Sequence, residues 1–139
     1  LNLVWHRLEP GPNAIEGLTR HKRRFTICTL SNGNIGLLTD MAKRAGLPWD
    51  CILSAENFQK YKPDPAVYLG AARIFGCEAC DVMLVAAHHS DLRAAESCGL
   101  KSAFVERPHE YGAVRPPERE SNPAVRARDL IDLAAQLGC

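Results

Sequence analysis

The 139-residue sequence lacks three features that mark large classes of proteins. Its 17 Lys+Arg residues are balanced by 16 Asp+Glu residues, so the formal net charge is only +1. Proteins that bind nucleic acids or membrane surfaces usually carry a basic excess, and the sequence therefore predicts neither partner. The longest unbroken apolar run, residues 82–87, is far too short to span a bilayer. No basic start is followed by an apolar run, so we predict no signal peptide.

Cysteine is present, but not at the spacing of a zinc site. Cys77 and Cys80 form a C-x-x-C pair, and no second C-x-x-C or H-x-x-x-H supplies the two further ligands that zinc needs. The remaining cysteines are irregularly spaced. They are Cys28, Cys51, Cys98 and Cys139. We expect free thiols in a reducing compartment, hence a cytoplasmic protein without a bound metal.

Helix and strand signals alternate along the chain. Apolar residues recur at helical spacing in five segments, which are residues 13–24, 35–45, 65–75, 91–98 and 130–137. Short apolar or β-branched runs lie between them, at residues 25–30, 51–53, 82–87 and 101–105. Residues 107–124 hold four prolines and are expected to be irregular. Such alternation predicts an α/β fold, a Rossmann-like parallel sheet with flanking helices and right-handed crossovers.

Polar residues follow the strand signals at three places. In an open parallel sheet, ligands bind outside the carboxyl ends of the strands, so these places are candidates for a site. The first is Ser31 and Asn32, whose hydroxyl and neighbouring N–H groups can bind a carboxylate or phosphate. A turn that caps the following helix explains the same two residues, and taken alone it is the commoner case.

The second and third places hold a lysine and an aspartate. Lys62 lies in a loop stiffened by Pro63 and Pro65, where an ammonium group can hold a carboxylate ionised and neutralise developing charge. Most loop lysines are merely solvated, however. Asp91 can anchor Lys62, orient a water molecule, or simply cap the next helix.

Histidines and a tyrosine complete the candidates. His88 and His89 share the turn before Asp91, and one of them can donate a hydrogen bond to a bound anion. Exposed histidines are common in turns, which is the simpler interpretation. Tyr68 lies one turn into its helix, at a position that is more often part of a core.

Three ordered motifs together are more specific than any one residue. They are residues 29–34 (TLSNGN), 61–68 (YKPDPAVY) and 85–92 (VAAHHSDL). This set resembles the haloacid dehalogenase superfamily, and more narrowly its type II, L-2-haloacid dehalogenase branch, over nearly the whole chain. In that family an aspartate at a strand end attacks the carbon that bears the halogen, and water hydrolyses the resulting ester. The resemblance implies a hydrolase of short 2-halo carboxylic acids that needs no cofactor.

The resemblance also implies roles for individual residues. Ser31 and Asn32 would bind the substrate carboxylate or the departing halide. Lys62 would hold the nucleophilic aspartate ionised, and Tyr68 would help to orient the site. Asp91 would fix Lys62 and assist the hydrolytic water.

Two positions depart from the pattern of that family. His88 stands where many members have Asn, and Ala86 stands where they have Ser. Both departures concern the residues that position water, a role in which we expect His88 to share. The sequence leaves open whether the protein forms a homodimer.

Two alternatives come from the same residues. A metal-dependent phosphatase of the superfamily would hold Mg²⁺ with an acidic residue four positions before Asp91, where this chain has Ala87. A non-catalytic α/β fragment or binding module is the second alternative.

The first motif of the family, an apolar strand that ends in Asp, does not precede residue 25. We therefore expect residues 13–139 to form a partial core domain that lacks the first central strand and most of the helical cap. Residues 1–12 would be the exit segment of that cap. The 139 residues by themselves would be inactive and poorly stable, because a missing central strand removes ladder hydrogen bonds from two neighbours.

Overall fold

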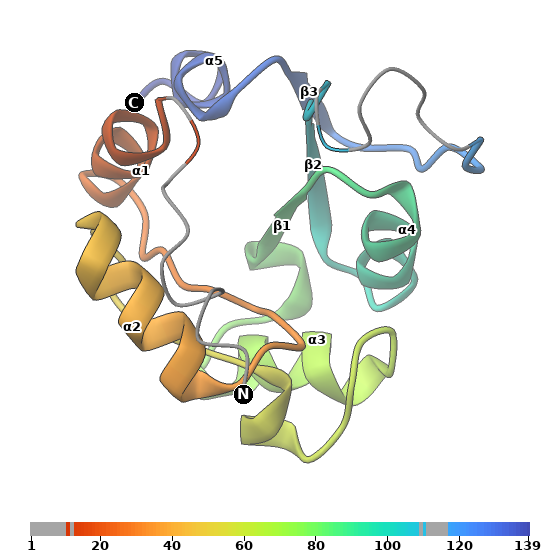
Figure 1. Ribbon diagram of the computed structural model, residues 1–139. Coiled ribbons are helices and arrows are strands. Elements are labelled where there is room, and N and C mark those ends of the chain that lie inside the picture. The colour runs from red at the N-terminus through yellow and green to blue at the C-terminus, as the bar shows by residue number, and fades with distance from the viewer. Residues whose placement is uncertain (1–10, 12, 109, 111–116) are drawn as a thin grey trace. The chain divides into compact units, whose positions relative to one another are not determined.

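The structure, a computed structural model, describes residue 11, residues 13–108, residue 110 and residues 117–139. The chain divides into two compact units. Figure 1 colours the chain by residue number, so that the residues of each unit can be followed. The first unit comprises Leu1–Tyr61 and Leu130–Cys139, and the second comprises Lys62–Asp129. The exit segment predicted for residues 1–12 lies, except for Gly11, outside the described residues. The division predicted at residue 12 therefore stays a prediction.

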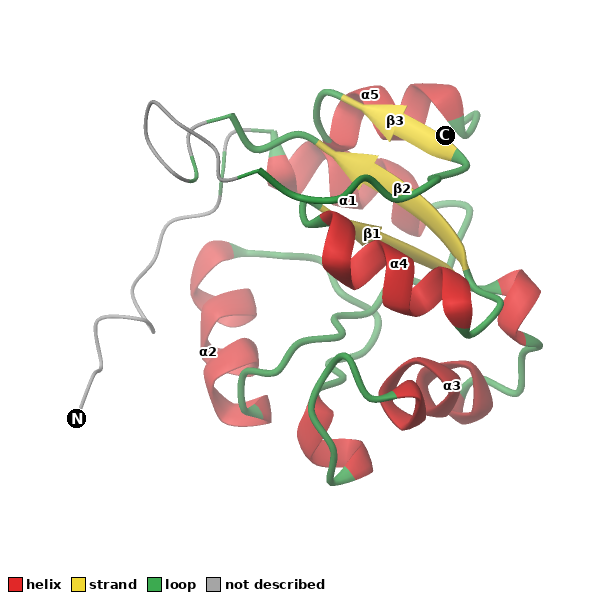
Figure 2. Ribbon diagram, turned by 90° about the vertical axis from the view of Figure 1, so that its right-hand side faces the viewer, coloured by secondary structure: helices red, strands yellow, loops and turns green. Residues whose placement is uncertain are grey.

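A parallel sheet organises the second unit. Its strands, in spatial order, are β1 (Met83–Ala86), β2 (Lys101–Val105) and β3 (Val125–Ala127). All of them run parallel, and Ala86 pairs with Phe104 at the end of the β1–β2 ladder. Figure 2 shows helix α4 (His89–Ser97) lying along one face of this sheet. The predicted Rossmann-like α/β class is confirmed.

Helix α3 (Pro65–Ile74) begins where the sequence predicts it. The Asp64 carboxylate accepts a hydrogen bond from the Ala66 N–H at 2.9 Å, and Pro65 occupies the first helical position. Helix α3 packs against α4, and both helices contribute fully buried apolar side chains, among them Val67 and Leu92. A short 3-10 turn, η3 (Ala79–Asp81), leads from α3 into β1.

Two helices that are distant in sequence pack together in the first unit. Figure 1 shows α1 (Ala14–Lys22) beside α5 (Leu130–Gln136). They meet at Gly17, where a Cβ atom would lie only 2.5 Å from the Cβ of Leu130. His21 is buried beside this contact, with its Nε2 3.1 Å from the Leu130 carbonyl oxygen. Burial lowers the pKa of His21.

The first unit also holds α2 (Ile35–Ala45) and a 3-10 turn, η2 (Ala55–Phe58). Helix α2 begins at Asn34, whose side chain accepts a hydrogen bond from the Leu37 N–H at 2.7 Å. It ends at Gly46, which adopts a φ of 67°. No helix within the described ranges is long and apolar enough to cross a membrane.

The strand predicted over residues 25–30 is wrong in its extent, as is the one suggested at residues 51–53. The two segments meet only in isolated parallel bridges, Cys28 with Cys51 and Ser31 with Ser54. The side chain of Thr29 interrupts the ladder between these bridges. The Thr29 hydroxyl donates to the Leu53 carbonyl at 2.8 Å and accepts from the Leu53 N–H at 3.0 Å. The sequence favours a strand because the β-branched residues fit one, but at Leu53 the Thr29 hydroxyl takes the place of regular backbone hydrogen bonds.

Strand β3 is absent from the prediction, which places no strand after residue 105. Its residues Val125–Ala127 are only three and follow a proline-rich segment, so no alternating pattern announces them. Pairing with β2 forms the strand instead, beginning at Ala103 opposite Val125. Residues 107–124, where described, are irregular as predicted.

Candidate active site

Three of the predicted site residues form one hydrogen-bonded cluster in the second unit. The Lys62 ammonium lies 2.6 Å from Oδ2 of Asp91, as an ion pair. The Tyr68 hydroxyl donates to Oδ1 of the same carboxylate, also at 2.6 Å. Asp91 thus has both oxygens engaged, one by a cation and one by a phenol. We call Lys62, Tyr68 and Asp91 the Lys–Tyr–Asp cluster.

The local structure places each member of this cluster. Lys62 belongs to the loop before α3, Tyr68 lies in the first turns of α3, and Asp91 lies in the first turn of α4. Because α3 packs against α4, the two helices bring the phenol and the carboxylate together. Asp91 makes these contacts from the helix that follows β1, at the carboxyl end of that strand.

The cluster is largely withdrawn from water. The side chains of Lys62 and Asp91 are 17% and 19% exposed, and Tyr68 is fully buried. Burial, and then the hydrogen bond to Asp91, raise the pKa of Tyr68 far above its ordinary value. Tyr68 therefore stays a neutral hydrogen-bond donor at every pH at which the protein is folded. It is a core residue whose hydroxyl also bonds to Asp91.

The raised pKa of Tyr68 predicts how the stability of the protein changes at alkaline pH. The pKa of this side chain in the folded protein is above that in the unfolded chain, about 10, so its contribution to stability is complete below that pH and declines above it. We expect the free energy of unfolding of the wild type to fall more steeply above pH about 10 than that of Tyr68→Phe. Urea titrations at pH 9 and pH 11 test this. Equal declines for the two proteins would contradict it.

Ser31 and Asn32 belong to the first unit. The Ser31 side-chain oxygen accepts a hydrogen bond from the Gly33 N–H at 3.0 Å, and its carbonyl accepts from the Ala55 N–H at 2.8 Å. Ser31 thus forms a turn, while Asn34 caps the following helix. The roles of Ser31 and Asn32 toward a ligand stay predictions.

His88 pairs with an acidic residue of the irregular segment. Its Nε2 lies 3.1 Å from Oε2 of Glu110. The neighbouring His89 is buried, and its ring stacks on Phe104 with centroids 4.4 Å apart. Nδ1 of His89 also lies 2.8 Å from the Ser121 hydroxyl. The two adjacent histidines therefore have different surroundings.

Glu118 caps the N-terminus of α4. This residue is not among those predicted from the sequence. Its carboxylate accepts a hydrogen bond from the Ser90 N–H. Burial would raise the pKa of Glu118, but the backbone N–H groups of Ser90 and His89 outweigh it and lower the pKa. The partners are 28 residues apart, and no motif connects them. Only the fold could reveal that this carboxylate caps the helix that carries Asp91.

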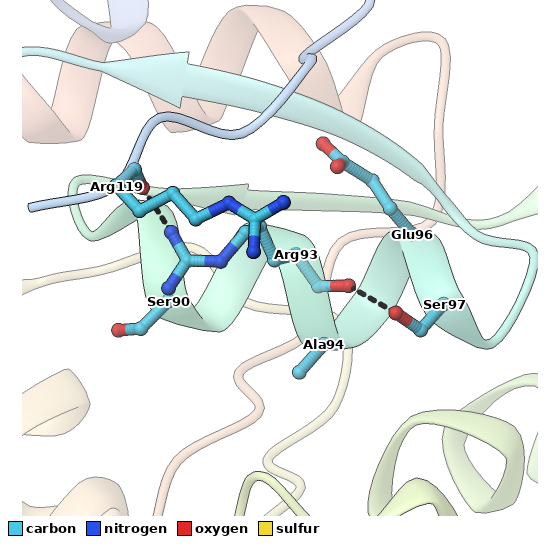
Figure 3. A pocket seen from close by; sticks show the side chains of 6 residues that line it. All are labelled: Ser90, Arg93, Ala94, Glu96, Ser97 and Arg119. Carbon is cyan, nitrogen blue, oxygen red and sulfur yellow. Dashed lines mark hydrogen bonds between the residues drawn. The ribbon is translucent and has the colours of Figure 1, made fainter.

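An open pocket of about 640 Å³ lies on the second unit. Figure 3 shows its lining, which is Ser90, Arg93, Ala94, Glu96, Ser97 and Arg119. The Arg93 side chain donates to the Arg119 carbonyl oxygen, and the Ser97 hydroxyl donates to the Arg93 carbonyl oxygen at 2.8 Å. None of the predicted site residues lines this pocket. Among the residues that the structure describes, no group of three or more His, Cys, Asp or Glu could hold a metal ion.

The parallel sheet and the Lys–Tyr–Asp cluster define the class, a Rossmann-like α/β protein in which a loop lysine pairs with a carboxylate on the helix that follows strand β1. Comparison with known families narrows this class. Residues 6–105 match the family of haloacid dehalogenase-like hydrolases. The chain belongs to that family.

Individual relatives agree with this assignment. (S)-2-haloacid dehalogenase 4A of Burkholderia cepacia is 31% identical over 123 residues, which are 86% of this chain and 51% of that protein. The crystal structure of the L-2-haloacid dehalogenase PA0810 matches with a TM-score of 0.91 and 47% identity, over 96% of this chain and 60% of that one. The defluorinating L-2-haloacid dehalogenase Rha0230 matches with a TM-score of 0.92 and 46% identity, over 97% and 56%. The chain spans about half the length of the curated relative.

Proposed function

We propose that the complete protein hydrolyses the carbon–halogen bond of short (S)-2-halo carboxylic acids. The observation that carries the proposal is the Lys–Tyr–Asp cluster, in which a largely buried ammonium group is held at 2.6 Å by a carboxylate. Relatives named as (S)-2-haloacid and L-2-haloacid dehalogenases support the substrate class.

The proposed reaction has two steps. The carboxylate of an aspartate outside these 139 residues attacks the carbon that bears the halogen, the halide leaves with the bonding electrons, and the carbon inverts. Water then attacks the carbonyl carbon of the aspartyl ester, which releases the 2-hydroxy acid and restores the aspartate. No step requires a metal ion.

The positive charge of Lys62 would stabilise negative charge in both steps. Its ammonium group would keep the attacking aspartate ionised and would stabilise the negative charge that develops during ester hydrolysis. Asp91 would hold Lys62 in place and Tyr68 would orient Asp91, since Asp91 accepts one hydrogen bond from Lys62 and one from Tyr68. Asp91 would also assist the attacking water.

The remaining predicted residues would serve the substrate. Ser31 and Asn32 would bind the substrate carboxylate or the departing halide through hydroxyl, amide and backbone donors. His88 would share in positioning the water, at the place where many family members have Asn.

A phosphatase reaction is the weaker candidate, for a reason in the sequence. The position four residues before Asp91, from which a phosphatase of this superfamily would supply a Mg²⁺ ligand, is Ala87. A hard cation prefers oxygen ligands, and an alanine side chain offers none.

The test uses the polypeptide extended upstream to the length of its relatives. We expect it to release chloride from (S)-2-chloropropionate, to form (R)-lactate and to leave the (R)-substrate unchanged. Fluoride release from fluoroacetate, measured in parallel, would define the halogens accepted. A single turnover in ¹⁸O-labelled water should place the label in an aspartate side chain of the enzyme. The label should reach lactate only in later turnovers, because the first lactate takes its oxygen from that side chain before the label enters it. Phosphate release from p-nitrophenyl phosphate with Mg²⁺, without halide release, would refute the proposal.

A further inference from the structure

Two cysteines face each other across the neighbouring segments of the first unit. Cys28 and Cys51 are direct partners in one of its isolated parallel bridges. Adjacent strands lie about 4.7–4.9 Å apart, which is within the range of about 4.4–6.8 Å between Cα atoms that a disulfide spans. Both residues are partly exposed, so a small oxidant can reach them.

The surroundings of this pair allow adjustment of the backbone. On one side, the Ile27 N–H donates to the Asp50 carboxylate at 2.8 Å. On the other side, the Thr29 hydroxyl bridges to the backbone of Leu53. A bridge bounded by side-chain hydrogen bonds can shift more easily than one inside a continuous ladder. The two sulfur atoms can therefore approach to bonding distance without breaking a sheet.

We propose that Cys28 and Cys51 form a reversible oxidation site, at which a peroxide converts the two thiols into a disulfide. The proposal is independent of the hydrolase function, because it rests on the bridge and not on the Lys–Tyr–Asp cluster. Neither cysteine belongs to that cluster.

Hydrogen peroxide is the only oxidant that the reaction needs. One thiolate attacks the peroxide, so a sulfur–oxygen bond forms, the oxygen–oxygen bond breaks and water leaves. The second thiolate attacks the resulting sulfenic acid, so the sulfur–sulfur bond forms and the second oxygen leaves as water. Two thiols are oxidised, and one peroxide is reduced to two waters. A dithiol such as dithiothreitol reverses the change.

The neighbours of Cys28 predict how the rate depends on pH. Burial, and then the nearby Cys51 and Asp50, raise the pKa of Cys28 to about 11. Only the thiolate reacts, so disulfide formation should accelerate as the pH rises from 7 toward 10. The Lys22 ammonium contacts Asp50 at 2.9 Å, so a cation faces the carboxylate that adjoins Cys51.

Peptide mapping of the complete protein tests the proposal. The protein is treated with hydrogen peroxide, its remaining thiols are blocked with iodoacetamide, and it is digested with trypsin without reduction. We expect residues 25–43 and residues 45–60 to appear as one cross-linked species, about 2 Da lighter than the sum of the peptides. Dithiothreitol should separate them, and the yield should increase at higher pH.

Two variants make the result specific. The double variant Cys77→Ser/Cys80→Ser removes the exposed C-x-x-C pair and should leave the cross-link unchanged. Cys28→Ser should abolish the cross-link and leave Cys51 to accumulate as an over-oxidised or alkylated thiol. The proposal is overturned if both Cys28 and Cys51 remain fully alkylated after peroxide treatment, or if Cys51 pairs with a different cysteine in the wild type. A circular dichroism spectrum of each variant confirms that it is folded.

Discussion

Replacing Lys62 by methionine is expected to lower kcat for chloride release by the complete protein about 10²–10³-fold, with a smaller change in KM. Methionine has a similar length but no charge, so it removes the ammonium group that contacts Asp91 at 2.6 Å. In the proposed reaction this charge acts on the attacking aspartate and on the ester hydrolysis, so both steps slow. Steady-state assays with (S)-2-chloropropionate measure the effect.

A matched control is available in the first unit. The Lys22 ammonium pairs with Asp50 at 2.9 Å, but its side chain is 42% exposed and no function is predicted for it. Lys22→Met should therefore leave kcat within about twofold, since exposed ion pairs contribute little. If Lys62→Met and Lys22→Met retain the same activity, Lys62 has no part in the reaction.

Loss of activity must be separated from loss of structure. Removing Lys62 leaves the Asp91 carboxylate largely buried with one remaining contact, from Tyr68. Such a change can destabilise by about 3–5 kcal/mol. The double variant Lys62→Met/Asp91→Asn removes the uncompensated charge, so it should recover stability without recovering activity. Recovery of activity in the double variant would contradict the proposed role of Lys62.

Gly17→Ala is expected to destabilise the protein by about 1–3 kcal/mol, although alanine is the better helix former. A Cβ at this position would lie 2.5 Å from the Cβ of Leu130 and 2.9 Å from its carbonyl carbon. Both atoms are close to or part of the backbone of α5, so α1 and α5 must move apart. Urea denaturation followed by circular dichroism measures the change.

Gly36 offers the matched comparison within the same unit. It also lies in a helix, α2, but the nearest atom to its added Cβ would be Oδ1 of Asn34 at 3.5 Å. Gly36→Ala should therefore be neutral or stabilise by up to about 1 kcal/mol. Equal effects of the two substitutions would show that helix propensity, and not the α1–α5 contact, determines the cost at Gly17.

The sequence predicted most elements of the fold because their signals are local. The N-cap at Asp64 with Pro65, and the turn at Gly46, marked helix boundaries that the structure confirms. Residues 25–30 were predicted wrongly as a strand, because β propensity does not register the Thr29 hydroxyl bonding to Leu53, 24 residues away. The short strand β3 owes its existence to pairing with β2, which no local pattern reports.

In the candidate site, too, residues in local motifs could be predicted from the sequence, whereas residues that act through long-range contacts could not. Lys62, Tyr68 and Asp91 could be singled out because they occur in ordered motifs, and the structure brings the three side chains together. Glu118 and Ser121 could not, because their contacts with Ser90 and His89 join segments about thirty residues apart through a stretch without any motif. Their contribution depends on the path of an irregular segment.

The pairing of α1 with α5 also has a consequence for synthesis on the ribosome. His21 and its partner Leu130 are 109 residues apart, so α1 leaves the exit tunnel long before α5 is translated. At about 5–20 residues per second, the surface around Gly17 and Leu18 remains uncovered for roughly 5–20 s. The nascent chain thus presents an apolar helix face to chaperones until α5 has been translated.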